Sequence, residues 1–138
     1  MGRIAGIDFG LKRVGIALSD ELHISVSPQP TLLYEATDFW EKLLAVFADE
    51  NVEAVVVGTP YLDDEDHPMR EPIEQFISDL SERTPLPLHT QDESYSSANA
   101  VNVMLEISKK KKKRATKGVT DGIAAALILE DYLYSIKV

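Results

Sequence analysis

The chain has 138 residues and contains no cysteine. Without thiols it can form no disulfide, no thiolate metal site and no cysteine nucleophile, and such a composition is compatible with a reducing cytosol. Histidine is scarce as well, since the chain has 3, isolated from one another, and we assign none of them a role. Long apolar runs are missing too, because none approaches the roughly 20 residues that cross a bilayer. We therefore expect a soluble, cytoplasmic protein whose chemistry relies on neither thiols nor imidazoles.

Positive charge is in short supply, with 14 Lys and Arg against 23 Asp and Glu and a formal net charge of -9. By itself this balance argues against nucleic acid as a partner, because affinity for a polyanion comes largely from Lys and Arg. The distribution reverses that argument, since half of the bases stand close together, without an intervening acid, shortly before Asp121. They are Lys109, Lys110, Lys111, Lys112, Lys113, Arg114 and Lys117. We predict that this lysine-rich segment clamps phosphate groups of a nucleic acid; a solvated loop between helices is the alternative.

Apolar residues make up 44% of the chain, enough for one compact core, so we expect a single domain over residues 1–138. Residues 3–9 and 13–19 predict the two strands of a hairpin, joined by Gly10-Leu11-Lys12, whose glycine can take a positive φ. A third extended segment over about 23–34 contains prolines, which indicate bends or an edge strand.

The rest of the chain alternates between strands and helices. Helical spacing of apolar residues predicts a helix over 38–49, with Thr37 or Asp38 as its N-cap. The following elements are a central strand at 53–58, a loop at 61–72, a helix from about 73 to 83, a strand at 86–91, a third helix from Ser96 or Ser97 to about Ile107, and a fourth over about 120–135. The order βββαβαβαα predicts an α/β protein with a mixed five-stranded sheet, its first three strands antiparallel and the others parallel, flanked by helices on both faces.

Three acids stand at the edges of apolar segments: Asp8 at the end of the first strand, Glu93 after the last strand, and Asp121 at the start of the final helix. Each has a structural alternative, as the cap of a turn or as a first-turn acid of a helix. An ionised carboxylate near a core is costly unless it is paired or coordinates a cation. Converging acids favour Mg²⁺ or Mn²⁺, the hard ions that prefer oxygen ligands. Our leading hypothesis is therefore a metal-dependent nuclease.

Four short segments, in order and at suitable intervals, resemble a known family over nearly the whole chain. They are Asp8-Phe9-Gly10 with Lys12 and Gly15, then Gly58-Thr59-Pro60, then Asp92-Glu93 with Ser96-Ser97-Ala98-Asn99-Ala100, and Lys117-Gly118-Val119-Thr120-Asp121 before an alanine-rich helix. The sequence is similar in these segments to the YqgF family of the ribonuclease H-like superfamily. That family is described as Holliday-junction resolvases and as nucleases that process the 5′ end of pre-16S ribosomal RNA.

The resemblance implies a ribonuclease H-like fold with Asp8, Glu93 and Asp121 as catalytic metal ligands. Two Mg²⁺ or Mn²⁺ ions roughly 4 Å apart can activate a water and stabilise the leaving oxygen, without a dedicated protein base. We expect Lys12 to contact nucleic acid together with the lysine-rich segment. Gly10, Gly15 and Gly58 are expected at turns or where a backbone or phosphate approaches closely.

The chain departs from the family pattern at three places. Ser94 replaces the arginine that commonly follows the catalytic glutamate, and Asn99 replaces a later glutamate. Four acids at 63–66 stand where relatives carry a different loop, and they would repel a phosphate backbone. These changes permit a member that binds nucleic acid without cutting it.

Two other functions stay open. One is a noncatalytic RNA-binding module of the same fold. The other is a phosphate-binding fragment of the actin and sugar-kinase ATPase type, suggested by the segment Asp8 to Gly15, although those ATPases close two such domains around a nucleotide. RNA and branched DNA are not distinguished as substrates, and neither a monomer nor a homodimer is favoured.

Overall fold

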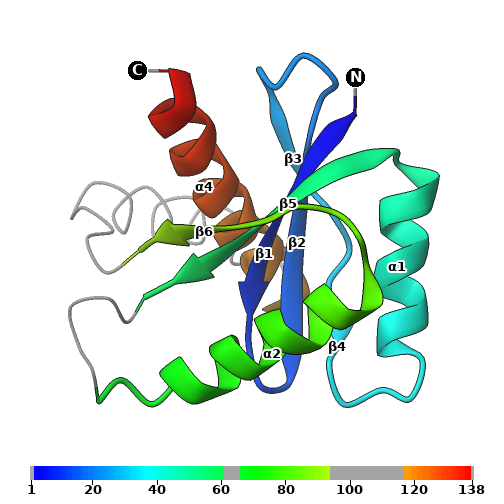
Figure 1. Ribbon diagram of the computed structural model, residues 1–138, viewed down its shortest axis with the longest axis vertical. Helices are drawn as coiled ribbons and strands as arrows, with labels where there is room; N and C mark the ends of the chain where they lie inside the picture. The colour runs from blue at the N-terminus through cyan, green and yellow to red at the C-terminus, as the bar shows by residue number, and fades with distance from the viewer. Residues whose placement is uncertain (1, 61–65, 94–116, 138) are drawn as a thin grey trace.

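The computed structural model describes residues 2–60, 66–93 and 117–137, and in the last range the side chains from Gly122 to Ile136. Within these residues a six-stranded mixed sheet carries helices on both faces (Figure 1). The strands are β1 (Arg3–Phe9), β2 (Arg13–Ser19), β3 (Val26–Pro28), β4 (Leu32–Leu33), β5 (Val52–Thr59) and β6 (Leu88–Asp92). The helices are α1 (Phe39–Asp49), α2 (Arg70–Arg83) and α4 (Lys117–Lys137). None of the helices in this part of the chain is long and apolar enough to cross a membrane.

The strands lie in the order β3-β2-β1-β5-β6, and β4 also pairs with β2. β1 and β2 form an antiparallel hairpin in which Asp8 faces Gly15, whereas the pairs β1–β5 and β5–β6 are parallel. Since β1, β5 and β6 run in the same direction, they end at one side of the sheet (Figure 1). We call this side the carboxyl edge.

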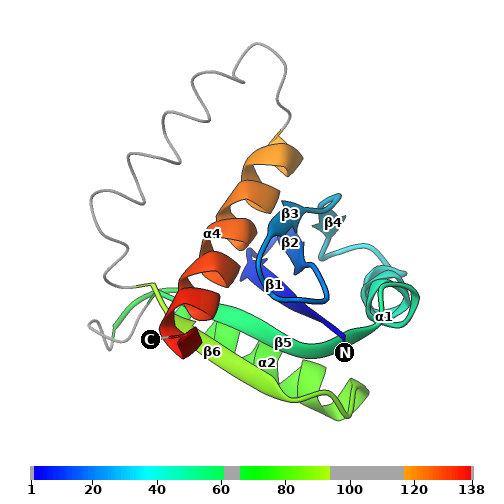
Figure 2. The same ribbon diagram turned by 90° about the horizontal axis from the view of Figure 1, so that it is seen from above.

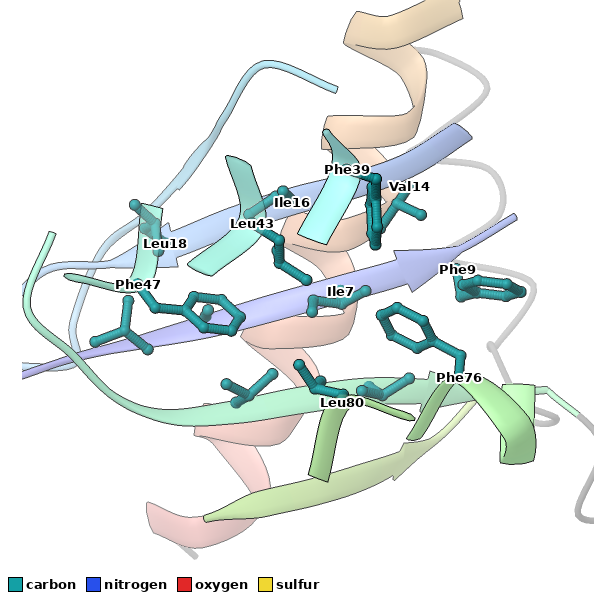
Figure 3. Close-up of a cluster of buried hydrophobic side chains, with 14 of the residues drawn as sticks. Ile7, Phe9, Val14, Ile16, Leu18, Phe39, Leu43, Phe47, Phe76 and Leu80 are labelled. Atoms are coloured by element: carbon teal, nitrogen blue, oxygen red, sulfur yellow. The ribbon is translucent and has the colours of Figure 1, made fainter. Parts of the chain in front are cut away.

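One face of the sheet packs against α1 and α2. The apolar residues of these helices recur every three or four positions, so each helix presents one apolar stripe. The stripes are Phe39, Leu43 and Phe47 in α1, and Ile73, Phe76 and Leu80 in α2. They meet the odd-numbered residues of β1, Ile7 and Phe9, in a closed core (Figure 3).

The other face packs against α4, which lies on the opposite side of the sheet from α1 and α2 (Figure 2). Gly122 lies beside the β3 end at Pro28, whereas Tyr132 stacks on His89 of β6 with ring centroids 5.5 Å apart. The helix therefore crosses the sheet from β3 to β6.

Glycines let α4 approach the strands between these points. A Cβ atom on Gly6 would lie 2.7 Å from Cβ of Leu129 and 2.9 Å from the carbonyl oxygen of Ala125. On Gly58 it would lie 2.5 Å from Cδ1 of Ile128. At these two positions the helix therefore leaves no room for a side chain, whereas Ile4 and Val56 on the same face pack against it.

The predicted α/β class, the hairpin, the parallel strands and the helices on both faces are confirmed. The predicted count of five strands is wrong, because the extended segment at 23–34 forms two short strands, β3 and β4, which both pair with β2. Pro28 and Pro30 lack the N–H group that a continuous strand would need. The predicted third helix lies outside the described residues.

The N-cap of α1 is Asp38, one of the two residues predicted for that position. Its side chain makes no capping bond, and its carboxylate pairs with Nζ of Lys42 at 3.2 Å. Gly10 does not take a positive φ. Its lack of a side chain serves close approach instead, since a Cβ there would lie 2.6 Å from the carbonyl oxygen of Arg13.

We predict that Gly6→Ala destabilises the protein by about 1–3 kcal/mol, because the added methyl group meets backbone atoms of α4 that cannot rotate away. Chemical unfolding of the purified variant measures this loss. Glu82→Ala, at an exposed position of α2, is the control and should change stability little. A Gly6→Ala protein as stable as the wild type would show that α4 does not pack closely on β1.

Candidate active site

The even-numbered side chains of β1 point toward α4, because successive side chains of a strand alternate between the two faces. Gly6 meets α4 directly, and Asp8 follows two residues later on the same face at the carboxyl edge. Asp8 is half-buried. The predicted catalytic acid therefore lies at the end of a central strand, beside the helix that carries Asp121.

Glu93 is held at the same edge by the end of β6. Its backbone N–H donates to the carbonyl oxygen of Thr59 at 3.1 Å, and the buried Thr59 hydroxyl donates to the carbonyl oxygen of Gln91 at 3.2 Å. The side chain of Glu93 lies beside Gly58, since a Cβ there would be 3.5 Å, an ordinary contact distance, from Cγ of Glu93. Side chains of Ile128 and Glu93 lie against Gly58, whereas the predicted approach of a backbone or phosphate there stays a prediction.

The environment of Glu93 opposes ionisation of its carboxyl group. Burial, the negative charge of Asp131 and a hydrogen bond with that side chain raise the pKa of Glu93 to about 8, and the charges of Asp92 and Asp8 add to the rise. Oε1 of Glu93 is buried and has no hydrogen-bond partner in the structure. A carboxyl group so placed either keeps its proton near neutral pH or needs a cation.

Asp131 is a site residue that the sequence reasoning missed. It lies on α4 one helical turn after Ile128, the residue that packs over Gly58, and this brings it beside Glu93. The one signal in the sequence that could have indicated it was its helical spacing from apolar residues that are buried. That spacing could not show which strand the helix crosses at this point.

Asp121 lies in the second turn of α4, and its side chain is outside the described part of the chain. Ten residues separate it from Asp131, a rise of about 15 Å along a helix. Its neighbour Gly122 lies at the β3 side of the sheet, whereas Asp131 lies at the β6 side. Glu93 thus lies beside the later acid of α4, and convergence of Asp8, Glu93 and Asp121 stays a prediction.

The described residues fit a divalent cation in part. No three His, Asp or Glu side chains among them converge in a set that could hold an ion. Two observations nevertheless suit a hard cation: the carboxylates of Asp131, Asp92 and Asp8 act on Glu93, and one buried carboxylate oxygen of Glu93 lacks a partner. Glu93 and Asp8 are therefore suitable ligands, and a complete set requires the side chain of Asp121.

The predicted nucleic-acid contacts are only partly placed. Lys12 is exposed at the tip of the β1–β2 hairpin, on the carboxyl edge, and Gly15 faces Asp8 across the same hairpin. Lys117 is the first residue of α4, but its side chain lies outside the part of the chain that the structure describes. The same is true of the other members of the lysine-rich segment. The same holds for Ser94, Asn99 and residues 63–65.

Comparison with known proteins connects this geometry to a family. A family model described as Holliday junction resolvase, RuvX, matches residues 2–135. A Chlorobaculum tepidum protein named "Putative pre-16S rRNA nuclease" is 42% identical over 135 residues, which cover 96% of this chain and 94% of that protein. A protein of the same name from Amoebophilus asiaticus is 40% identical over 139 residues, with 99% and 97% covered.

A solved structure shows the same fold. The structure of T. thermophilus RuvC in complex with a Holliday junction substrate has a TM-score of 0.60, 15% sequence identity, and covers 99% of this chain and 96% of that one. The predicted ribonuclease H-like class is confirmed.

We predict that the metal-free protein loses stability as the pH rises from about 4.5 to about 8. Glu93 has a raised pKa in the folded chain, so over this range the unfolded chain has released a proton that the folded chain still holds. Replacing the group by Glu93→Gln removes this loss. Unfolding in EDTA should show a variant that is more stable than the wild type at pH 8, with a smaller difference at pH 5.

The control for this prediction is Glu82→Gln on the exposed surface of α2, which should follow the wild type at both pH values. If Glu93→Gln is the less stable protein at pH 8, ionisation of Glu93 does not oppose folding.

Proposed function

Since the chain belongs to the Holliday junction resolvase family RuvX, a family of nucleases, we propose that it hydrolyses phosphodiester bonds at the carboxyl edge of its sheet with divalent metal ions. The observation that carries the proposal is the carboxyl group of Glu93, half-buried, with an unpartnered oxygen and other acids around it. Such an arrangement costs stability in the empty protein, and a cation reverses that cost.

Each acid has a distinct part in the proposal. Asp8 is anchored in a central strand that is paired on both sides, so its backbone position is fixed. Glu93 is attached through its backbone to β5, and its side chain reaches the same face of the sheet. Asp121 completes the set from α4. Bound divalent ions supply a water that loses its proton near neutral pH and positive charge for the leaving oxygen.

Asp131 has a positioning part in this arrangement. Its charge lies beside Glu93, so it raises the negative potential at that acid. The negative potential attracts cations to the carboxyl edge. It repels the phosphates of a nucleic acid that are not accompanied by cations. Lys12 and the lysine-rich segment supply the opposite charge for the substrate.

We propose the 5′ end of pre-16S ribosomal RNA as the substrate, because the curated relatives carry names of that kind and align over almost their whole length. A branched DNA junction is the second candidate, favoured by the description of the family model. Both substrates offer the same phosphodiester chemistry, so a direct comparison distinguishes them.

The test is incubation with a pre-16S-like RNA, a four-way DNA junction and single-stranded controls, each with Mg²⁺, Mn²⁺ or EDTA. We expect cleavage of the RNA with either ion and none in EDTA. Asp8→Asn and Asp121→Asn should lower the rate at least about 100-fold, since loss of a ligand exceeds the effect of its outer partners. Asp49→Asn, at an exposed position of α1, should cleave like the wild type.

Cleavage of the junction alone would assign the second substrate. Binding without metal-stimulated cleavage of either would indicate the noncatalytic module. Asp8→Asn and Asp121→Asn proteins as active as the wild type would mean that the ligands are assigned wrongly.

We also predict that replacing Lys110, Lys111, Lys112 and Lys113 by Ser weakens binding and flattens its dependence on salt, because fewer counterions are released from the nucleic acid. Titrations at several salt concentrations measure the slope. Lys42→Ser, which removes a lysine already paired with Asp38, should leave the slope unchanged. An equal slope in the quadruple variant would make the segment a solvated loop.

A further inference from the structure

The tip of the β1–β2 hairpin stands next to the candidate active site. Gly10-Leu11-Lys12 follows Phe9 at the end of β1, so the tip begins two residues after Asp8 on the carboxyl edge. Any strand of nucleic acid with a phosphate at Asp8 passes close to these residues.

Two leucines are exposed at this end of the sheet. Leu11 at the tip is 56% exposed, and Leu33 in β4 is 60% exposed. β4 runs beside the end of the tip, because Leu33 pairs with Arg13 and the N–H of Tyr34 donates to the carbonyl oxygen of Lys12 at 2.9 Å. Together the two leucines expose apolar side chains beside the acids of the candidate site. Packing of the core does not account for this exposure.

The tip is stiff. Gly10 is in close contact with the carbonyl oxygen of Arg13, and β4 braces the hairpin from the side. Below it, the rings of Phe9 and Tyr34 lie edge to face with centroids 4.8 Å apart, and Tyr34 contacts Phe39 in the same way at 5.0 Å. Leu11 therefore lies next to residues held by strand pairing and ring packing, and such pre-organisation limits the entropy that a ligand must remove on binding.

The charge of the tip suits a polyanion. Residues 10–13 contain Lys12 and Arg13 and no acid. Lys12 is exposed and has no ion pair among the residues that the structure describes, whereas Arg3, Lys42 and Arg70 are each paired with an acid. An apolar side chain next to such a cation matches a nucleotide, which offers a flat base beside a charged phosphate.

We propose that the hairpin tip reads the nucleic acid at the cleavage position, with Lys12 on a phosphate and Leu11 packed on the face of an unpaired or unstacked base. The inference rests on the proposed function and narrows its substrate class to strands with an accessible base next to the cut. Apolar side chains at base steps and bases stacked on side chains are general means of contacting such strands. Leu33 borders the same base or the next one.

The test measures binding without cleavage, with Ca²⁺ in place of Mg²⁺. The probes are RNA strands carrying the fluorescent base 2-aminopurine at successive positions, either single-stranded or fully paired to a complement. We expect the wild type to change the fluorescence at one position of the single strand. Leu11→Ser should abolish that change and weaken binding of the single strand by about 10-fold, with little effect on the duplex.

Two variants are the controls. Leu11→Met keeps an apolar side chain and should keep the fluorescence change. Leu22→Ser, at a position that is 66% exposed in the turn between β2 and β3 at the other end of the sheet, should behave as the wild type.

The inference is overturned if Leu11→Ser keeps the fluorescence change and the affinity of the wild type, or if it weakens single strand and duplex equally. A wild type that changes the fluorescence but never cleaves with Mg²⁺ or Mn²⁺ would support the tip and contradict the nuclease. A wild type that cleaves without any change of fluorescence would support the nuclease and overturn the tip. Absence of all nucleic-acid binding would overturn both.

Discussion

Close packing of α4 across a face of the sheet is the constraint on which the candidate site depends. The helix reaches β1 and β5 because Gly6 and Gly58 lack side chains where Leu129 and Ile128 pass. This contact brings Asp131 of α4 beside Glu93. A helix held farther away by even one methyl group per strand would move Asp131 relative to Glu93.

The electrostatics of the carboxyl edge follow from that packing. Burial and the charge of Asp131, which α4 carries to the end of β6, raise the pKa of Glu93. The fold thus concentrates negative charge at one edge of the sheet, and the hairpin tip with Lys12 adds a cation beside it.

Local patterns in the sequence predicted most elements, because their apolar periods are decided within the elements themselves. β1 and β2 have the predicted bounds, and the helix at 39–49 begins one residue after the predicted start. The split into β3 and β4 was missed because it depends on pairing with β2. Asp131 was missed for a related reason: its role depends on where α4 crosses β6, and no local pattern contains a crossing point. Gly6 carried no recognisable signal until its neighbours from α4 were known.

The backbone hydrogen bond between Glu93 and Thr59 lowers the entropy cost of binding a ligand at the candidate site. Because this N–H group already belongs to the sheet ladder, ordering the acid requires only rotation about side-chain bonds, which costs at most about 2 kcal/mol for a residue of this type. An acid on a free loop would have to immobilise several backbone units as well. In this protein the backbone of Glu93 is already ordered by folding, so a ligand need not order it on binding.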